Sequence, residues 1–299
     1  MKFRFALDLG DGPLKVWTPS KFGYPVRAQL WTSSDGLAER NLGMSSQGTL
    51  TFNQAVRGIT EFIEVAVHTI LYVRQVYPAD IFVRRKKYET PVYQSRHPGL
   101  NEYISGAVKA IGDELVLGDV EKVVVVIKDK DEVALERFIF SIQTMIAIES
   151  FNKNTSVEGA MATTALGQYF RSFMVKLSMI ESQLAELPRD GVRSYSYGIN
   201  NARADSSGGE ITFAIVLELQ EGKVPSAMPD KDDPPPWLPA VTQHTTSGAS
   251  EKAELHMVRA VDTGVVNLSL AVQESADKLR ILAASKGEQI SAHEFRKST

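Results

Sequence analysis

The feature that most constrains the fold is an apolar stripe between Thr51 and Val73. Its apolar side chains recur every third or fourth position, which is the spacing of one face of an α-helix. Thr51 and Gln54 have the spacing of a capping box, which predicts where the helix begins. Val65 and Leu71 widen the stripe, so we expect this helix to be buried on most sides. The stripe consists of Phe52, Val56, Ile59, Phe62, Ile63, Ala66, Ile70 and Val73.

Further helices and strands follow this first helix. A second helix is expected to begin at Pro98, since proline favours the first helical position, and a third is expected over about 157–187. The unbroken β-branched run Val123–Ile127 is typical of a strand covered on both faces. Other strands are expected at 136–142, 211–219 and 266–272. Helices packed on a largely antiparallel sheet, with late strands after long irregular connections, predict an α+β fold.

Composition restricts the classes of function. The chain has 299 residues, a formal net charge of −3 and no cysteine. A chain without net positive charge has no global field to hold nucleic acid, so we expect no direct nucleic-acid partner. The missing cysteines exclude disulfides and thiolate metal sites. No window has the length of a membrane span and the first residues do not resemble a signal peptide, so no membrane partner is expected.

No motif in the sequence predicts catalysis or a cofactor. There is no phosphate-binding glycine loop, no nucleophile elbow and no HExxH zinc motif. Glu61, Glu64 and His68 lie near one helical face, but a metal site needs further ligands, so a packing histidine is favoured. The basic run 84–87 has the composition of a nuclear import signal or phosphate contact, or of an exposed charged segment. We therefore expect no catalytic residues, no metal and no cofactor.

Trp237 is the most unusual single residue. It lies in the proline-rich segment PPPWLP, which is incompatible with a central strand or a helix interior. A tryptophan in such a segment either anchors a loop to the core or serves as an interface hot spot. The residues alone favour neither interpretation.

Three long strings carry a resemblance to a known family: EVAVHTILYVRQVYP, RRKKY and DVEKVVVVI. They closely resemble the HORMA-domain accessory subunit of the translesion DNA polymerase zeta, a relative of the mitotic-arrest checkpoint adaptor. The resemblance is dense over 52–133, continues to Leu187 and is thinner over 210–274. It implies a HORMA domain at 51–274, with three main helices on a mostly antiparallel sheet. Residues 1–50 would then be an unassigned extension and residues 275–299 a tail.

The resemblance also implies how a partner is bound. In this family a peptide lies against the second helix and the sheet, and a C-terminal segment, the safety belt, folds over it. The belt would comprise about residues 220–274. The positions that match peptide contacts are Tyr103, Phe213, Trp237 and the neighbouring Leu238. Leu255 and Leu270 match a second partner surface, and Arg171 matches a HORMA homodimer interface. Ser269 and Ala271 depart from the larger side chains of better-known relatives.

The function implied is that of a nuclear, non-catalytic adaptor. It would trap a proline-containing peptide of the polymerase zeta catalytic subunit and bridge to a Y-family deoxycytidyl transferase. The alternative is a HORMA adaptor of the spindle checkpoint or of the meiotic chromosome axis, and the RRKKY and EKVVVVI strings favour the polymerase subunit. An enzyme with an unrecognised site is a third possibility.

Residues 1–50 lie outside the resemblance. Phe3, Phe5, Leu7 and Leu9 alternate with other side chains in the period of a strand. A turn is expected at 11–13 and a returning strand at 14–17. Val16–Pro19 has the opening of the family's belt ligands, although Pro25 follows one position too late. We hypothesise that this segment docks in cis, as an added strand or near the belt groove. The alternatives are a disordered extension and a mistaken start of the coding sequence.

Overall fold

The computed structural model describes residues 2–5, 48–146, 152–188, 211–226, 236–249 and 252–284. Its centre is a seven-stranded sheet in the order β7-β1-β6-β4-β5-β9-β8, and each neighbouring pair in it is antiparallel. The strands are β1 (Lys2–Phe5), β4 (Val120–Lys128), β5 (Ala134–Thr144), β6 (Thr212–Leu219), β7 (Trp237–Pro239), β8 (Glu254–Asp262) and β9 (Val266–Glu274).

Three helices cover one face of this sheet: α2 (Phe52–Val73), α3 (Pro98–Leu117) and α4 (Thr163–Ser178). The capping box of α2 is confirmed, because Thr51 and Gln54 exchange side-chain to backbone hydrogen bonds. Phe62 of α2 stacks on Phe170 of α4 and meets Phe140 of β5 edge to face. These aromatic contacts join the helices to the sheet, and the expected α+β fold is confirmed.

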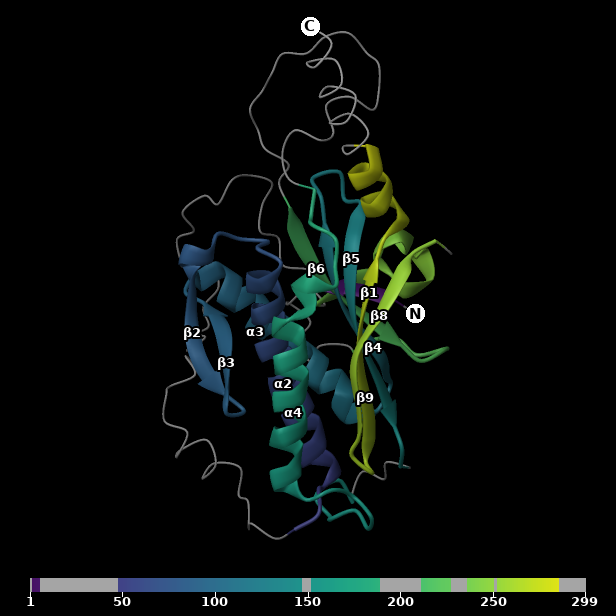
Figure 1. Ribbon diagram of the computed structural model, residues 1–299. Helices are drawn as coiled ribbons and strands as arrows, with labels where there is room; N and C mark the ends of the chain where they lie inside the picture. Colours follow the sequence, from purple (N-terminus) through teal and green to yellow (C-terminus); the bar gives the residue numbers. More distant parts are fainter. Residues whose placement is uncertain are drawn as a thin grey trace, which may run out of the picture.

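A two-stranded hairpin, β2 (Phe82–Lys87) with β3 (Thr90–Ser95), packs on the side of the helices away from the large sheet (Figure 1). The basic run 84–87 therefore belongs to a strand, which the sequence did not predict. The third helix is shorter than expected: α4 ends at Ser178, and a short 3-10 helix, η2 (Ile180–Ser182), follows it. The other 3-10 helices are η1 (Ala79–Ile81), η3 (Thr242–His244) and η4 (Thr246–Gly248).

A buried charge network ties the end of the described chain to the core. The Arg74 guanidinium donates to both carboxylate oxygens of Glu136, and Lys278 donates to Glu136 and to Glu274. Lys278 is fully buried and lies in the helical residues 276–284. Buried charges of this kind are stable only when paired, so the network fixes that helix in place. The boundaries expected at residues 50 and 275 therefore do not delimit the fold, since β1 and this helix belong to it.

Several expectations fall on residues that the structure does not describe. These are the turn at 11–13, the strand at 14–17 and the segment Val16–Pro19. Within the described ranges, no helix is long and apolar enough to cross a membrane.

Candidate functional site

The strand β1 is inserted into the large sheet between two strands that are remote from it in the sequence. It pairs on one side with β6, where Arg4 faces Val216, and on the other with β7, where Arg4 faces Leu238. Both backbone edges of this short strand are therefore paired. We call the position between β6 and β7 the strand slot. It accepts a short extended segment and satisfies its backbone on both sides.

Aromatic side chains line the inner wall of the strand slot. Phe5 meets Tyr103 of α3 and Trp237 of β7 edge to face, with ring centroids 5.7 and 5.3 Å apart. Phe213 of β6 lies 5.4 Å from Tyr103 in the same geometry. All four rings are buried. Three of the four residues that the resemblance assigned to peptide contact thus form one wall, and Phe5 packs against two of them.

The hydroxyl of Tyr103 binds the backbone of β6 beside the slot. The backbone N–H of Ile215, the next β6 residue beyond the pairing with Arg4, donates to Tyr103 Oη at 3.4 Å. Burial raises the pKa of Tyr103 to about 12, against the opposing effect of this hydrogen bond. The phenol therefore stays neutral at physiological pH and keeps its hydrogen-bonding capacity in an otherwise apolar wall.

The outer wall of the strand slot carries a buried carboxylate. Glu218 is buried on β6, and its Oε1 accepts the backbone N–H of Thr246 at 2.6 Å. Two ammonium groups flank this carboxylate, Lys2 at 3.8 Å and Lys122 at 3.5 Å. The Lys2 ammonium also donates to Ser247 at 2.6 Å. Glu218 therefore links β1, β4 and the segment of η4, and the sequence analysis did not identify it.

The segment after β7 crosses the outer face of the sheet and is held at the β4–β5 turn. Gln243 and His244 contact the carbonyl oxygen of Glu132 at 2.8 and 3.0 Å. The Glu132 carboxylate pairs with Lys128 and lies 3.9 Å from Arg4. Partial burial opposes ionisation of Glu132, but Lys128, His244 and Arg4 together hold its pKa below the usual value. β8 then begins at the opposite edge of the sheet, so the chain passes around β1.

The remaining predicted residues lie elsewhere. Leu238 is on the outer side of β7 and is 43% exposed. Leu255 on β8 is 57% exposed, and it shares its face with Met257, which the sequence analysis missed and which is 60% exposed. The expectation for Leu270 is wrong in this fold, because its side chain is fully buried toward the helices opposite Phe140.

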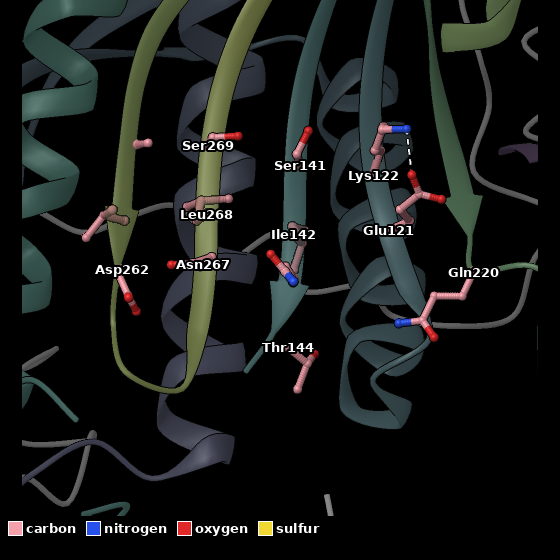
Figure 2. Close-up of a pocket in the computed structure, with 13 residues that line it drawn as sticks. Glu121, Lys122, Ser141, Ile142, Thr144, Gln220, Asp262, Asn267, Leu268 and Ser269 are labelled. Atoms are coloured by element: carbon pink, nitrogen blue, oxygen red, sulfur yellow. Dashed lines mark hydrogen bonds and ion pairs between the residues drawn. The ribbon is translucent and has the colours of Figure 1, made fainter. Parts of the chain in front are cut away.

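A pocket lies on the same outer face, between β4, β5, β9 and β8 (Figure 2). Figure 2 shows Lys122, Ser141, Asn267 and Ser269 along neighbouring strands on this face. Most of the residues that line it are polar, and on β8 they are confined to Ala260, Val261 and Asp262. On β9, Ser269 points to this outer face while the adjacent Leu270 is buried. The resemblance places a partner surface on this strand.

Arg171 lies on the exposed side of α4. Its Nη1 is 3.1 Å from the carboxylate of Glu89, in the turn between β2 and β3, and both side chains are largely exposed. The neighbouring Tyr169 and Val175 on α4 are 38% and 41% exposed. The residue is thus accessible for association, and an intramolecular ion pair orients it.

His68 and the cluster of Glu254, His256 and Glu274 have structural partners. His68 is buried and accepts the backbone N–H of Ser95, and burial lowers its pKa to about 4. This geometry fits the packing histidine favoured from the sequence. Glu254, His256 and Glu274 bring donor atoms within 4.8 Å of one another. Glu274 already accepts from Lys278 and from the backbone of Ala185, so this group belongs to the buried charge network.

Comparison with known proteins identifies relatives of the chain. A family model described as HORMA domain matches residues 56–195. The mitotic spindle assembly checkpoint protein MAD2B of Gallus gallus is 44% identical over 142 residues, which are 46% of this chain and 63% of that protein. The match thus spans less than two thirds of that relative. MAD2B of Danio rerio is 31% identical over 77% of this chain and 95% of its own length.

A second group of relatives has a different name. The DNA polymerase zeta processivity subunit of Schizosaccharomyces pombe is 38% identical over 42% of this chain and 59% of its own length. Among solved structures, a chain of the mitotic checkpoint complex matches with a TM-score of 0.54 at 18% identity. That match covers 74% of this chain and 99% of the other. At this level of identity the structural match shows a shared fold.

Proposed function

Because this chain belongs to the HORMA-domain family and is related to its polymerase zeta accessory subunits, we propose that it is a non-catalytic adaptor of translesion DNA polymerase zeta. It traps a proline-containing peptide of the catalytic subunit under the safety belt, residues 220–274. The peptide enters the strand slot as an added strand. In this account the protein acts in DNA repair in the nucleus and binds DNA only through its partners.

The strand slot is the observation that supports this proposal best. Its backbone edges on β6 and β7 pair with an extended segment, and its inner wall offers Tyr103, Phe213 and Trp237. Main-chain pairing supplies affinity in such strand addition, and pockets for alternate side chains supply specificity. The segment that crosses the sheet after β7 must open before a bound strand leaves, so we expect slow dissociation.

A second surface serves a second partner in this proposal. The Y-family deoxycytidyl transferase would dock on the exposed apolar pair Leu255 and Met257 of β8. These residues lie at the edge of the sheet opposite β7. The two partners therefore bind without competing for the same strands, as a bridging adaptor requires.

The alternative function is that of a HORMA adaptor in the spindle checkpoint or the meiotic chromosome axis. The names of the MAD2B relatives favour the checkpoint. In the structure titled HTP-2 bound to HTP-3 motif-6, a protein of this fold, with a TM-score of 0.53, holds a segment of another protein. The same strand slot would serve such a ligand, so the choice depends on which peptide binds.

The proposal is tested by the dissociation rate of a labelled peptide from the polymerase zeta catalytic subunit, measured with the full chain. Truncation of a buried aromatic hot spot costs on the order of 2 kcal/mol, so Trp237→Ala should speed dissociation about 30-fold. The dissociation rate is the informative quantity, because it depends on the contacts that the bound peptide makes. It does not depend on whether another segment later occupies the strand slot.

Leu255→Ala is the matched control, since it removes an exposed apolar side chain at the other edge of the sheet. It should leave this rate unchanged and weaken only the transferase. A peptide that fails to bind, while spindle-checkpoint or meiotic peptides do bind, would assign the chain to the alternative function. An unchanged dissociation rate in Trp237→Ala would reject the strand slot as the site.

A further inference from the structure

We propose that Lys2–Phe5 is a ligand of the strand slot supplied by the chain itself, so that a partner peptide must displace it. This inference rests on the proposed function for its consequence, but the capture of Lys2–Phe5 can be tested separately. The strand is separated in sequence by more than two hundred residues from both strands that hold it. Proximity in the sequence therefore does not account for its position in the sheet. We attribute this position to the match between the segment and the two walls of the strand slot.

The aromatic residues of the segment match the inner wall. In the sequence Lys-Phe-Arg-Phe, successive side chains point to opposite faces, so Phe3 and Phe5 share one side. Phe5 is buried between Tyr103 and Trp237, and Phe3 packs partly buried against the same core. Edge-to-face pairs at these distances add to the free energy of burial.

The basic residues of the segment match the outer wall. Lys2 lies between Glu218 and Ser247, and Arg4 faces the carboxylate of Glu132. Without a basic residue above it, Glu218 would lose its contact with Lys2 and would keep Lys122 and the more distant Arg137 as cationic neighbours. The slot is thus complementary to a strand that alternates basic and aromatic residues, and this describes the ligand class that it selects.

The backbone of the segment is held like that of an internal strand. The Lys2 carbonyl accepts the N–H of Ala240, just after β7. Because Lys2–Phe5 is tethered to its own slot, its effective concentration is high, and docking in cis precedes any encounter in trans. The apparent affinity for a partner peptide then falls by the fraction of molecules whose slot is open.

The first test uses the segment itself as the probe, a fluorescent synthetic peptide of residues 1–10, titrated into the full chain. Phe5→Ala weakens the cis strand and leaves the walls of the slot intact. It should therefore bind the peptide at least about tenfold more tightly than the wild type does. Equal affinities for the two proteins would overturn the proposal.

The second test locks the segment in place. The chain has no cysteine, so Arg4→Cys with Leu238→Cys creates one defined disulfide between residues that face each other across β1 and β7. Facing residues of adjacent antiparallel strands have the separation that a disulfide needs. The oxidised protein should bind none of the peptide, and reduction should restore binding. Ala260→Cys with Ser269→Cys, a facing pair on β8 and β9, is the control, and its oxidation should change nothing.

A nonreducing gel separates the remaining outcomes. An intramolecular disulfide in a monomer supports cis docking. A covalent dimer would mean that the segment enters a second copy, and a disulfide that fails to form would mean that it is not in the slot; either result overturns the proposal. If Phe5→Ala does not fold, the locked variant still decides. If the peptide of residues 1–10 binds as expected and no polymerase peptide does, only the proposed function is rejected.

Discussion

Glu218 shows how one residue can organise a binding site. It is a carboxylate in the apolar strand β6, and burying it is costly unless its oxygens are paired. Thr246, Lys2 and Lys122 approach it from three separate elements. A charge within the string ITFAIVLEL is visible in the sequence, but its partners are remote in the chain. Its role in joining β1 to the crossing segment therefore becomes apparent only from the structure.

Glu64 provides a prediction of pH dependence. Burial, and then repulsion from Glu61, raise its pKa to about 7, while Lys87 opposes the shift. The folded state thus holds a proton that the unfolded chain loses near pH 4.5, so stability falls as pH rises from about 4.5 to about 7. Glu64→Gln removes this loss. We expect the variant to be more stable than wild type at pH 8, on the order of 1 kcal/mol, in urea denaturation.

At pH 4.5 the advantage of Glu64→Gln should largely disappear, because the wild-type carboxyl is then protonated in the folded state. Glu158→Gln, at an exposed position, is the control and should show no such change with pH. A constant difference between Glu64→Gln and wild type from pH 4.5 to 8 would contradict the assigned shift.

The residues of the site were predictable to different degrees. Tyr103, Phe213 and Trp237 were assigned from the family resemblance, and the structure brings them together. Leu270 was misassigned although the alternation of its strand placed it on the buried side with Leu268 and Val272. Met257 was missed because apolar and polar residues follow one another in β8 without a regular alternation.

At the scale of elements, the start of α2 is fixed by its capping box, and this gives a measurable stability. Thr51 accepts the N–H of Gln54 at 3.1 Å, and the Gln54 side chain accepts the N–H of Thr51 at 3.0 Å. Thr51→Ala removes one of these bonds at the end of the most buried helix. We expect a loss of about 1 kcal/mol in the free energy of unfolding.

Thr51→Ser keeps the hydroxyl and is the matched control for the cap. It should retain most of the stability that Thr51→Ala loses, as judged from the midpoint of urea denaturation at constant slope. Equal losses in the two variants would show that packing of the Thr51 methyl group, and not its hydrogen bond, matters.

Elements with a strong local pattern were predicted, and those that depend on remote pairing were not. The helices α2 and α3 begin as expected, because caps and proline positions are local signals. The strand β2 was missed because its basic side chains hide the alternation that pairing with β3 imposes. Helix α4 was predicted to be longer than it is, because the helical spacing of apolar residues continues into η2. There the backbone has changed from an α-helix to a 3-10 helix.

At the scale of the whole molecule, the place of β1 was the least predictable feature. The alternation of Phe3 and Phe5 predicts a strand, but the edge that it joins depends on β6 and β7. Sequence periodicity carries no information on such long-range pairing. The sequence therefore left cis docking as a hypothesis beside a disordered extension and a mistaken start of the coding sequence.

Self-association is a further prediction for the molecule as a whole. We propose that Arg171 supports a HORMA homodimer through α4, next to the exposed Tyr169 and Val175. Arg171→Ala should shift sedimentation toward the monomer while changing stability little, because the pair with Glu89 is exposed. Arg57→Ala, an exposed arginine on α2, serves as the control. Identical monomeric profiles for wild type and Arg171→Ala would remove this proposal.

A partner peptide is proposed to enter the strand slot that β1 occupies. Hydrogen exchange of the full chain tests this proposal most directly, with and without a saturating peptide of the polymerase zeta catalytic subunit. The amides of Lys2–Phe5 should lose their protection when the peptide binds, while those of β6 and β7 stay protected by the new strand. If the peptide saturates the protein and β1 remains as protected as before, the peptide binds elsewhere and the account is wrong.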